Sequence, residues 1–227
     1  MKISTAWLAD WVDCPWTPQE LGSRLTLAGF ELESLAPAAP PFSGVVVAEI
    51  LEAQRHPQAD KLQVCRVSTG HGEPLQIVCG AANARAVLRT ALAQVGAQLP
   101  GGLAIKAAKL RGVESAGMLC SAKELGLAEA SEGILELAAD APVGTDLRSL
   151  LALDDTVLEL NVTPNRGDAM SVIGVAREVA ALAGKPLRGP SSRAIPAAHS
   201  ERHEVLLEAA AACPRFLARV IRGLDNR

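Results

Sequence analysis

The segment KLRGVESAGMLCSAKELGL, residues 109–127, brings together side chains suited to two kinds of chemistry. Cys120 offers a thiol, which could act as a nucleophile or as a metal ligand. Lys109 and Arg111 offer cations, which could hold an anion and would share one face of a strand because they lie two residues apart. The segment is therefore either a thiol centre or an anion-binding surface.

The rest of the chain gives a thiol centre little support. No histidine lies near Cys120 in sequence to activate it, and the five cysteines form no CxxC pair and no Cys/His cluster with zinc-ligand spacing. Motifs of the GxSxG, HExxH, Walker and GxGxxG types are absent. His56 could act as a base, but its place before Pro57 is more typical of a turn near the surface. We expect Cys120 to be a buried, reduced thiol, and we identify no catalytic residue and no metal ligand.

An anion-binding surface has more candidates. Residues 44–127 carry nine cationic and six acidic side chains, although the whole chain has a net charge of −3. Asn83, Ser115 and Ser121 could donate hydrogen bonds, and Gly112 would let the backbone approach a ligand. No aromatic side chain is available there for stacking, and Met118 is a poor substitute. Phosphates of a nucleic acid would fit these residues, but a solvated loop edge explains the charges equally well.

Composition limits the class of protein. Hydrophobic residues make up 49% of the 227 positions and aromatic residues only 3%, so the core must be aliphatic. No run of eighteen apolar residues occurs, and the first residues do not have the pattern of a signal peptide. Widely spaced cysteines fit a reducing compartment. We therefore expect a cytoplasmic protein without a membrane segment.

Helices are expected on both sides of a middle segment of short strands. Thr17-Pro18 with Glu20 indicates a capped helix that ends at Gly29, and residues 30–36 alternate like a strand. Near the other end, residues 156–164 read as a strand before a helix capped by Asp168, with Met170 and Leu182 on its apolar face. The same cap explains NVTPNRGD (161–168) better than a phosphate-binding loop does.

Between these flanks, a proline-rich connector at 36–44 precedes about five short strands. Short strands with mixed turns in about eighty residues indicate a small closed barrel, such as an OB-fold, although a sandwich fits nearly as well. We expect a short helix near SAKELGL (121–127), and a further strand in CPRFLARVIRGL (213–224) after a linker.

Three segments in order resemble the tRNA-binding OB domain of EMAP-II-like proteins: HPQADKL (56–62), QIVCGAANAR (76–85) and KAAKLRGVESAGMLCSAKELGL (106–127). The flanks, MKISTAWLADWVD with LTLAGFELESL and then LELNVTPNRGDAMSVIGVAREVAALAGKP, resemble one host of that domain. That host is the beta subunit of bacterial phenylalanyl-tRNA synthetase, of which the chain looks like an N-terminal fragment.

The resemblance implies an α+β fold in which a small discontinuous α/β domain holds an inserted five-stranded OB-fold β-barrel. The implied parts are residues 1–40 and 151–190 for the α/β domain and residues 41–150 for the OB domain. Residues 191–227 would be a linker and the start of a truncated editing-type domain.

The resemblance also implies ATP-dependent charging of tRNA with phenylalanine by a class II α2β2 enzyme. ATP and Mg²⁺ are implied for the whole enzyme, no cofactor is implied for this fragment, and tRNA and the alpha subunit are the implied partners. Alternatives are a free-standing tRNA-binding module and a purely structural scaffold.

Six residues match tRNA-contacting positions of related domains: Asn83, Lys106, Arg111, Ser115, Met118 and Ser121. To these we add Lys61, Arg85 and Lys109 on electrostatic grounds. Ala82 and Ala84 depart from the family, which commonly has Pro and Val there.

Overall fold

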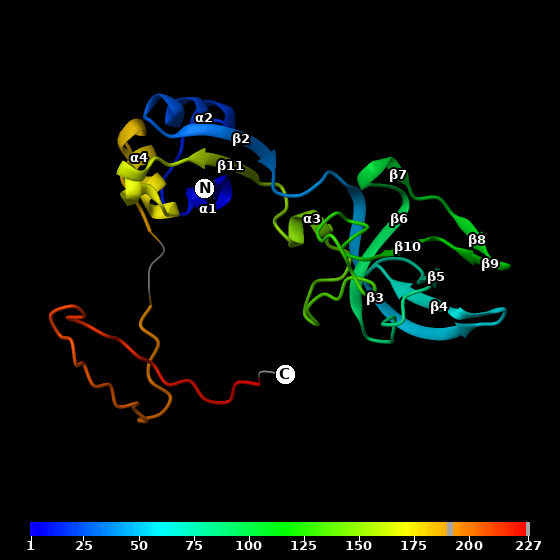
Figure 1. The fold of residues 1–227 in the computed structure, drawn as a ribbon. Coiled ribbons are helices and arrows are strands. Elements are labelled where there is room, and N and C mark those ends of the chain that lie inside the picture. Colours follow the sequence, from blue (N-terminus) through cyan, green and yellow to red (C-terminus); the bar gives the residue numbers. More distant parts are fainter. Residues whose placement is uncertain (190–192, 226–227) are drawn as a thin grey trace. The chain divides into compact units, whose positions relative to one another are not determined.

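The computed structural model describes residues 1–189 and 193–225, and the chain divides into two units, Met1–Gly189 and Pro190–Arg227. All helices and strands of the described residues belong to the first unit (Figure 1). Every strand pair in it is antiparallel, which confirms the predicted α+β class. None of the described helices is long and apolar enough to cross a membrane.

Three strands from distant parts of the sequence form a small sheet in the order β1-β11-β2, of which Figure 1 labels β2 and β11. They are β1 (Lys2–Ser4), β2 (Glu31–Pro37) and β11 (Thr156–Asn161). Helices α1 (Thr5–Ala9), α2 (Pro18–Leu27) and α4 (Val172–Ala183) contribute apolar side chains to the same core. Phe30, Leu158, Leu160 and Val179 have no exposed surface in that core. The chain before residue 38 and the chain after residue 155 therefore depend on each other for burial.

Helix α2 begins as the sequence predicts. The backbone N–H of Glu20 donates to the Thr17 hydroxyl (3.3 Å), and the backbone N–H of Thr17 donates to the Glu20 carboxylate (2.9 Å). This reciprocal capping box satisfies two backbone donors at the helix start. The bonds that the Glu20 carboxylate accepts from the backbone N–H and from the hydroxyl of Thr17 hold the pKa of this carboxyl below its usual range.

Helix α4 begins three residues later than the sequence suggests, so the predicted Asp168 cap is wrong. Ser171 is the N-cap and accepts from the backbone N–H of Gly174 (3.1 Å). Asp168 lies in the 3-10 helix η2 (Pro164–Ala169) and accepts instead from the Arg166 side chain (3.1 Å). Met170 precedes the helix and is 60% exposed, so it does not belong to the predicted apolar face.

Arg166 accounts for the polar character of this turn. Its guanidinium pairs with Asp168 and Glu178, which raises its pKa, and it stacks over the Phe30 ring at 4.5 Å. The arginine of NVTPNRGD thus ties η2 to α4.

A larger sheet follows the order β10-β6-β3-β4-β5, with β7 paired to β6 (Figure 1). Its strands are β3 (Ser43–His56), β4 (Ala59–Ser68), β5 (Leu75–Cys79), β6 (Arg89–Leu99), β7 (Leu103–Ala104) and β10 (Gly117–Cys120). A separate hairpin joins β8 (Ala108–Leu110) to β9 (Val113–Ser115), and the short helix α3 (Leu147–Leu150) follows. The strand pairs form an open path, and no closed barrel is found among the described residues.

Alternation along the strands builds two cores in the larger sheet. Cys120 packs with Val47 in one core, whereas the adjacent Leu119 packs with Ile50 and Ile77 in the other. Residues 90–93 of β6 are all buried, so both faces of this strand are covered. Neither core shares residues with the core of the small sheet.

Two predicted elements are wrong. Residues 122–126 form a turn rather than a helix, because Gly126 (φ +67°) leaves the helical region after one turn. No strand forms between residues 193 and 225, where Phe216 and Leu217 are largely exposed and no partner strand is described. The predicted boundary at residues 190 and 191 lies outside the described residues.

Replacing Leu160 with Ala should destabilise the small sheet. The side chain has no exposed surface, so the change leaves a cavity and should lower the free energy of unfolding by about 2–5 kcal/mol. Leu27→Ala is the matched control, because Leu27 is 90% exposed and its loss should cost about 0.5 kcal/mol or less. Urea unfolding followed by circular dichroism measures both. Equal losses for the two variants would contradict the assignment of Leu160 to the core.

Candidate nucleic-acid interface

Two hairpins carry most of the exposed cations expected to meet phosphate. The β3–β4 hairpin turns at Pro57 and Gln58, and the β8–β9 hairpin turns at Arg111 and Gly112. Arg111 (φ +49°) and Gly112 (φ +87°) both have left-handed backbone, as a two-residue type I′ hairpin turn requires. Arg111 therefore stands at the tip of its hairpin.

His56 connects the two hairpins. Its ring is 5% exposed, its Nδ1 lies 3.0 Å from the backbone N of Gln58, and its Nε2 lies 3.2 Å from the carbonyl oxygen of Leu110. His56 lies beside the β3–β4 turn, as expected, but the expectation that it is presented near the surface is wrong, because the β8–β9 hairpin covers the ring. Both ring nitrogens are engaged, which leaves His56 no free nitrogen for acid–base chemistry.

The cations of residues 44–127 fall into two groups. Arg66 pairs with Glu52 (2.7 Å), Arg85 with Glu136 (2.7 Å) and Arg89 with Glu49 (3.6 Å). The remaining cations are exposed, and within the described residues their side chains have no ion-pair or hydrogen-bond partner; these are Arg55, Lys61, Lys106, Lys109, Arg111 and Lys123. Unpaired cations keep their full attraction for an external anion. Asp60 and Glu114 lie in the same two hairpins and reduce the net positive charge.

A groove of about 510 Å³ lies between β5 and the base of the β8–β9 hairpin. Its lining consists of small and polar residues: Gln76, Ala107, Ala108, Lys109, Glu114, Ser115 and Ala116. The Gln76 side chain donates to the Glu114 carbonyl (2.8 Å) and fixes one wall. Lys109 thus stands beside a recess as well as on the hairpin.

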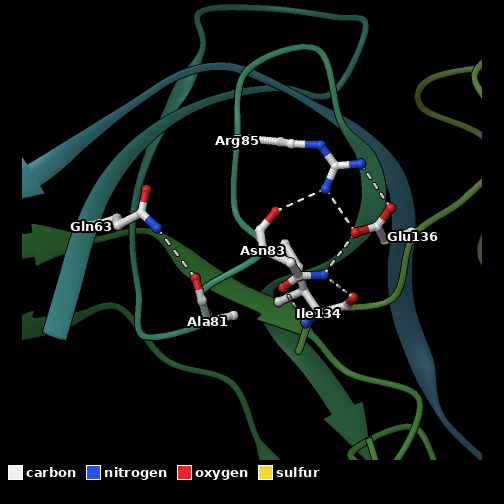
Figure 2. A network of polar contacts seen from close by, with 6 residues as sticks. All are labelled: Gln63, Ala81, Asn83, Arg85, Ile134 and Glu136. Carbon is white, nitrogen blue, oxygen red and sulfur yellow. Dashed lines mark hydrogen bonds and ion pairs between the residues drawn. The ribbon is translucent and has the colours of Figure 1, made fainter. Parts of the chain in front are cut away.

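Asn83 and Arg85 belong to a different network, shown in Figure 2. The Asn83 amide donates to the Ile134 carbonyl and accepts from the Ile134 backbone N–H, both at 3.0 Å. Arg85 donates to both carboxylate oxygens of Glu136, at 2.7 and 2.8 Å. These bonds, with a further one from Asn83, lower the pKa of the Glu136 carboxyl to about 2. The network fastens the loop 81–88 to the segment 132–137, and we call it the Asn83–Arg85 clasp.

Sequence reasoning missed the two residues that complete this clasp, Glu136 and Gly133. A Cβ at Gly133 would stand 2.2 Å from the Asn83 side-chain oxygen, so the close approach requires glycine. An acidic stretch follows the basic segment in the sequence, and it could have indicated that a carboxylate there pairs with one of the cations. It could not have indicated that Glu136 pairs with Arg85.

Three further candidates make contacts within the chain itself. The Ser115 hydroxyl is buried, donates to the Gly117 carbonyl (3.0 Å) and accepts from the Val78 backbone N–H (3.0 Å). The half-buried Ser121 hydroxyl donates to the Glu124 carboxylate (2.7 Å), and Met118 packs against an apolar core. The hydroxyl protons are therefore already used in the free chain, and contact of these residues with RNA stays a prediction.

Cys120 has the buried position that the sequence predicts. It has no exposed surface, and burial raises the pKa of its thiol to about 12. A thiol protonated at neutral pH is a poor nucleophile and a poor metal ligand. Among the described residues, no group of three or more histidine, cysteine, aspartate or glutamate side chains is arranged to hold a metal ion.

Comparison with known proteins gives a consistent result. The family model of the tRNA binding domain, tRNA_bind, matches residues 45–146. A phenylalanine–tRNA ligase beta subunit from Methylococcus capsulatus is 57% identical over all 227 residues, and one from Pseudomonas putida is 54% identical over 225 residues, or 99% of the chain. The chain belongs to the family of phenylalanine–tRNA ligase beta subunits.

This beta-subunit chain spans only 29% and 28% of the length of those two relatives. Solved structures with some likeness include the C-terminal domain of Plasmodium vivax p43 (21% identity) and a MetRS related protein from Pyrococcus horikoshii (24% identity). Each likeness covers 45% of the chain with a TM-score of 0.34, and they cover 57% and 87% of those two chains.

The Glu136 carboxyl of this beta-subunit chain should titrate near pH 2. Because its pKa lies below the ordinary value of 4.5, the clasp contributes stability above about pH 4.5 and loses that contribution as the pH falls toward 2. Arg85→Ala should return the titration midpoint toward 4.5, whereas Arg66→Ala should not, because Arg66 pairs with Glu52. NMR titration of the labelled Glu136 carboxyl measures the midpoint. A wild-type midpoint near 4.5 would show that the clasp does not form in solution.

Proposed function

We propose that the chain binds tRNA through its two hairpins. The unpaired, exposed cations at the hairpin ends carry this proposal, in particular Lys61, Lys109 and Arg111. Phosphate groups attract such cations and release condensed counterions when they bind, which favours association. The match of residues 45–146 to a tRNA binding domain supports tRNA as the nucleic acid.

The remaining predicted residues have graded roles in this proposal. Lys106 is exposed at the start of the segment that leads into β8 and adds a phosphate contact. Asn83 and Arg85 hold the loop 81–88 in place through the Asn83–Arg85 clasp. Ser115, Met118 and Ser121 bond or pack within the chain and so support the surface that the cations occupy. The groove beside Lys109 has room for one unstacked base.

In the whole enzyme, this region would serve ATP-dependent attachment of phenylalanine to tRNA. The relatives are named phenylalanine–tRNA ligase beta subunits, and from that kinship we propose an α2β2 assembly with an alpha subunit that carries catalysis. ATP and Mg²⁺ would act there, and the proposed role of this chain requires no cofactor. A ligase of this kind would work in the cytoplasm, where protein synthesis takes place.

We also propose that the larger sheet is an OB-type domain inserted into the small α/β domain. Two bonds support a connection between the ends of the open strand path: the Ala116 N–H donates to the Gln76 carbonyl (2.9 Å), and the Val78 N–H donates to the Ser115 hydroxyl (3.0 Å). The separate cores support a division into residues 1–40 with 151–190 and residues 41–150, followed by a further region at 191–227.

One observation favours a scaffold role instead. Four residues expected to contact tRNA already bond to other groups of the chain through their side chains: Asn83, Arg85, Ser115 and Ser121. A domain whose ancestral surface served only packing would look similar there. The unpaired cations of the hairpins do not serve packing, so tRNA affinity separates the two functions.

Replacing Lys106, Lys109 and Arg111 together with Ala should weaken tRNA binding and flatten its salt dependence. Each lost phosphate contact should reduce the slope of log affinity against log salt by about one, so the triple variant should lose about three. Filter binding or fluorescence anisotropy over a range of salt concentrations measures this slope.

Arg66→Ala is the control for this experiment. It removes a cation from the same segment, but one that Glu52 already neutralises, so the slope should not change. Unaltered affinity and slope in the triple variant would leave the scaffold role as the better account.

A further inference from the structure

His56 lies where the two hairpins of the interface meet. It is the last residue of β3, and its register partner Ala59 begins β4, so the ring stands at the β3–β4 turn. The residue across the ring is Leu110, the last residue of β8 and the neighbour of the tip cation Arg111. A buried imidazole therefore lies between two hairpins that carry cations.

The hydrogen bonds of the ring define its tautomer. A backbone N–H can only donate, so Nδ1 of His56 accepts from Gln58 through its lone pair (3.0 Å). A backbone carbonyl can only accept, so Nε2 carries the proton and donates to the oxygen of Leu110 (3.2 Å). The neutral Nε2–H tautomer satisfies both bonds at once, and no other form of the ring does.

The β8–β9 hairpin has few other attachments near its tip. Among the described residues its two strands pair with each other alone, and its bonds to β5 involve residues 114 and 115 of β9. The Gln76 side chain donates to the Glu114 carbonyl, and the Ser115 hydroxyl accepts from the Val78 backbone N–H. Among the hydrogen bonds between described residues, the bond from His56 is the one that ties the tip to the β3–β4 hairpin. Without it, the tip could move relative to Lys61 and Arg55.

We propose that His56 is a positioning residue for RNA binding, which couples the two hairpins through its Nε2–H bond to Leu110. The proposal rests on the tRNA-binding function proposed above. His56 itself touches no phosphate, because its ring is buried and both of its nitrogens are used. It holds Lys109 and Arg111 at a fixed distance from Lys61, so that one stretch of RNA backbone meets the cations of both hairpins without the cost of ordering them.

Two conservative substitutions separate the two bonds of the ring. The Gln side chain reaches about as far as Nε2 and ends in an amide N–H, so His56→Gln keeps a donor for the Leu110 carbonyl. The shorter Asn side chain places an acceptor near the position of Nδ1, so His56→Asn keeps only the local bond to Gln58. His56→Gln should keep affinity within about threefold of the wild type, whereas His56→Asn should bind as weakly as Lys109→Ala/Arg111→Ala. His56→Asn should also reduce the slope of log affinity against log salt by about two.

A double-mutant cycle measures the coupling, with all variants made in the full chain. If His56 acts by positioning the tip cations, adding His56→Asn to Lys109→Ala/Arg111→Ala should weaken tRNA binding no further. Additive losses, or wild-type affinity in His56→Asn, would overturn the positioning role while leaving the tRNA-binding function intact. If the proposed tRNA-binding function itself were wrong, the result would differ, because Lys109→Ala/Arg111→Ala would then bind tRNA as the wild type does.

The tautomer is testable without tRNA and without any variant. Long-range ¹⁵N–¹H NMR spectra of the wild-type chain should show His56 protonated at Nε2 and unprotonated at Nδ1. An Nδ1–H tautomer, or a ring that exchanges between tautomers, would overturn the proposal even if His56→Asn fails to fold.

Discussion

Strand β11 pairs with β1 on one side and with β2 on the other, and the rest of the first unit depends on this arrangement. The chain leaves the small sheet after Pro37 and must return to the same place at Thr156. The backbone N–H of Ala38 donates to the carbonyl of Asp155 (2.9 Å) and joins the two ends of this excursion. Asp155 also accepts from the Ser4 and Thr5 hydroxyls, which lowers the pKa of its carboxyl despite some burial. The intervening residues can therefore build their own cores without disturbing the small sheet.

Within that excursion, the cations divide into those paired with a carboxylate and those left exposed without a partner among the described residues. Arg85 faces a carboxylate with ideal two-point geometry and serves the fold. Lys109 and Arg111 are exposed on the β8–β9 hairpin, and in the proposed function they meet phosphate. In our proposal, His56 holds these cations at a fixed spacing from those of the β3–β4 hairpin, through its contact with the Leu110 carbonyl.

Local features were readable from the sequence, and distant pairings were not. The Thr17–Glu20 capping box depends on a spacing of three residues, and the burial of Cys120 follows from its apolar neighbours. Asp168 and Ser171 are equally good caps by type, and only the pairing of Arg166 with Asp168 and Glu178 decides between them. The partner of Asn83 lies 51 residues away, so no local pattern could identify it. His56 was misjudged for the same reason, because the hairpin that buries it begins about fifty residues later.

Amide hydrogen exchange of the chain, measured with and without tRNA, tests the central claim most directly. If RNA binds across the coupled hairpins, the amides of residues 58–61 and 109–113 should become protected together at the same tRNA concentration. The loop 81–88, which the Asn83–Arg85 clasp already holds, should change little. Protection confined to the loop 81–88, or to one hairpin without the other, would contradict the account.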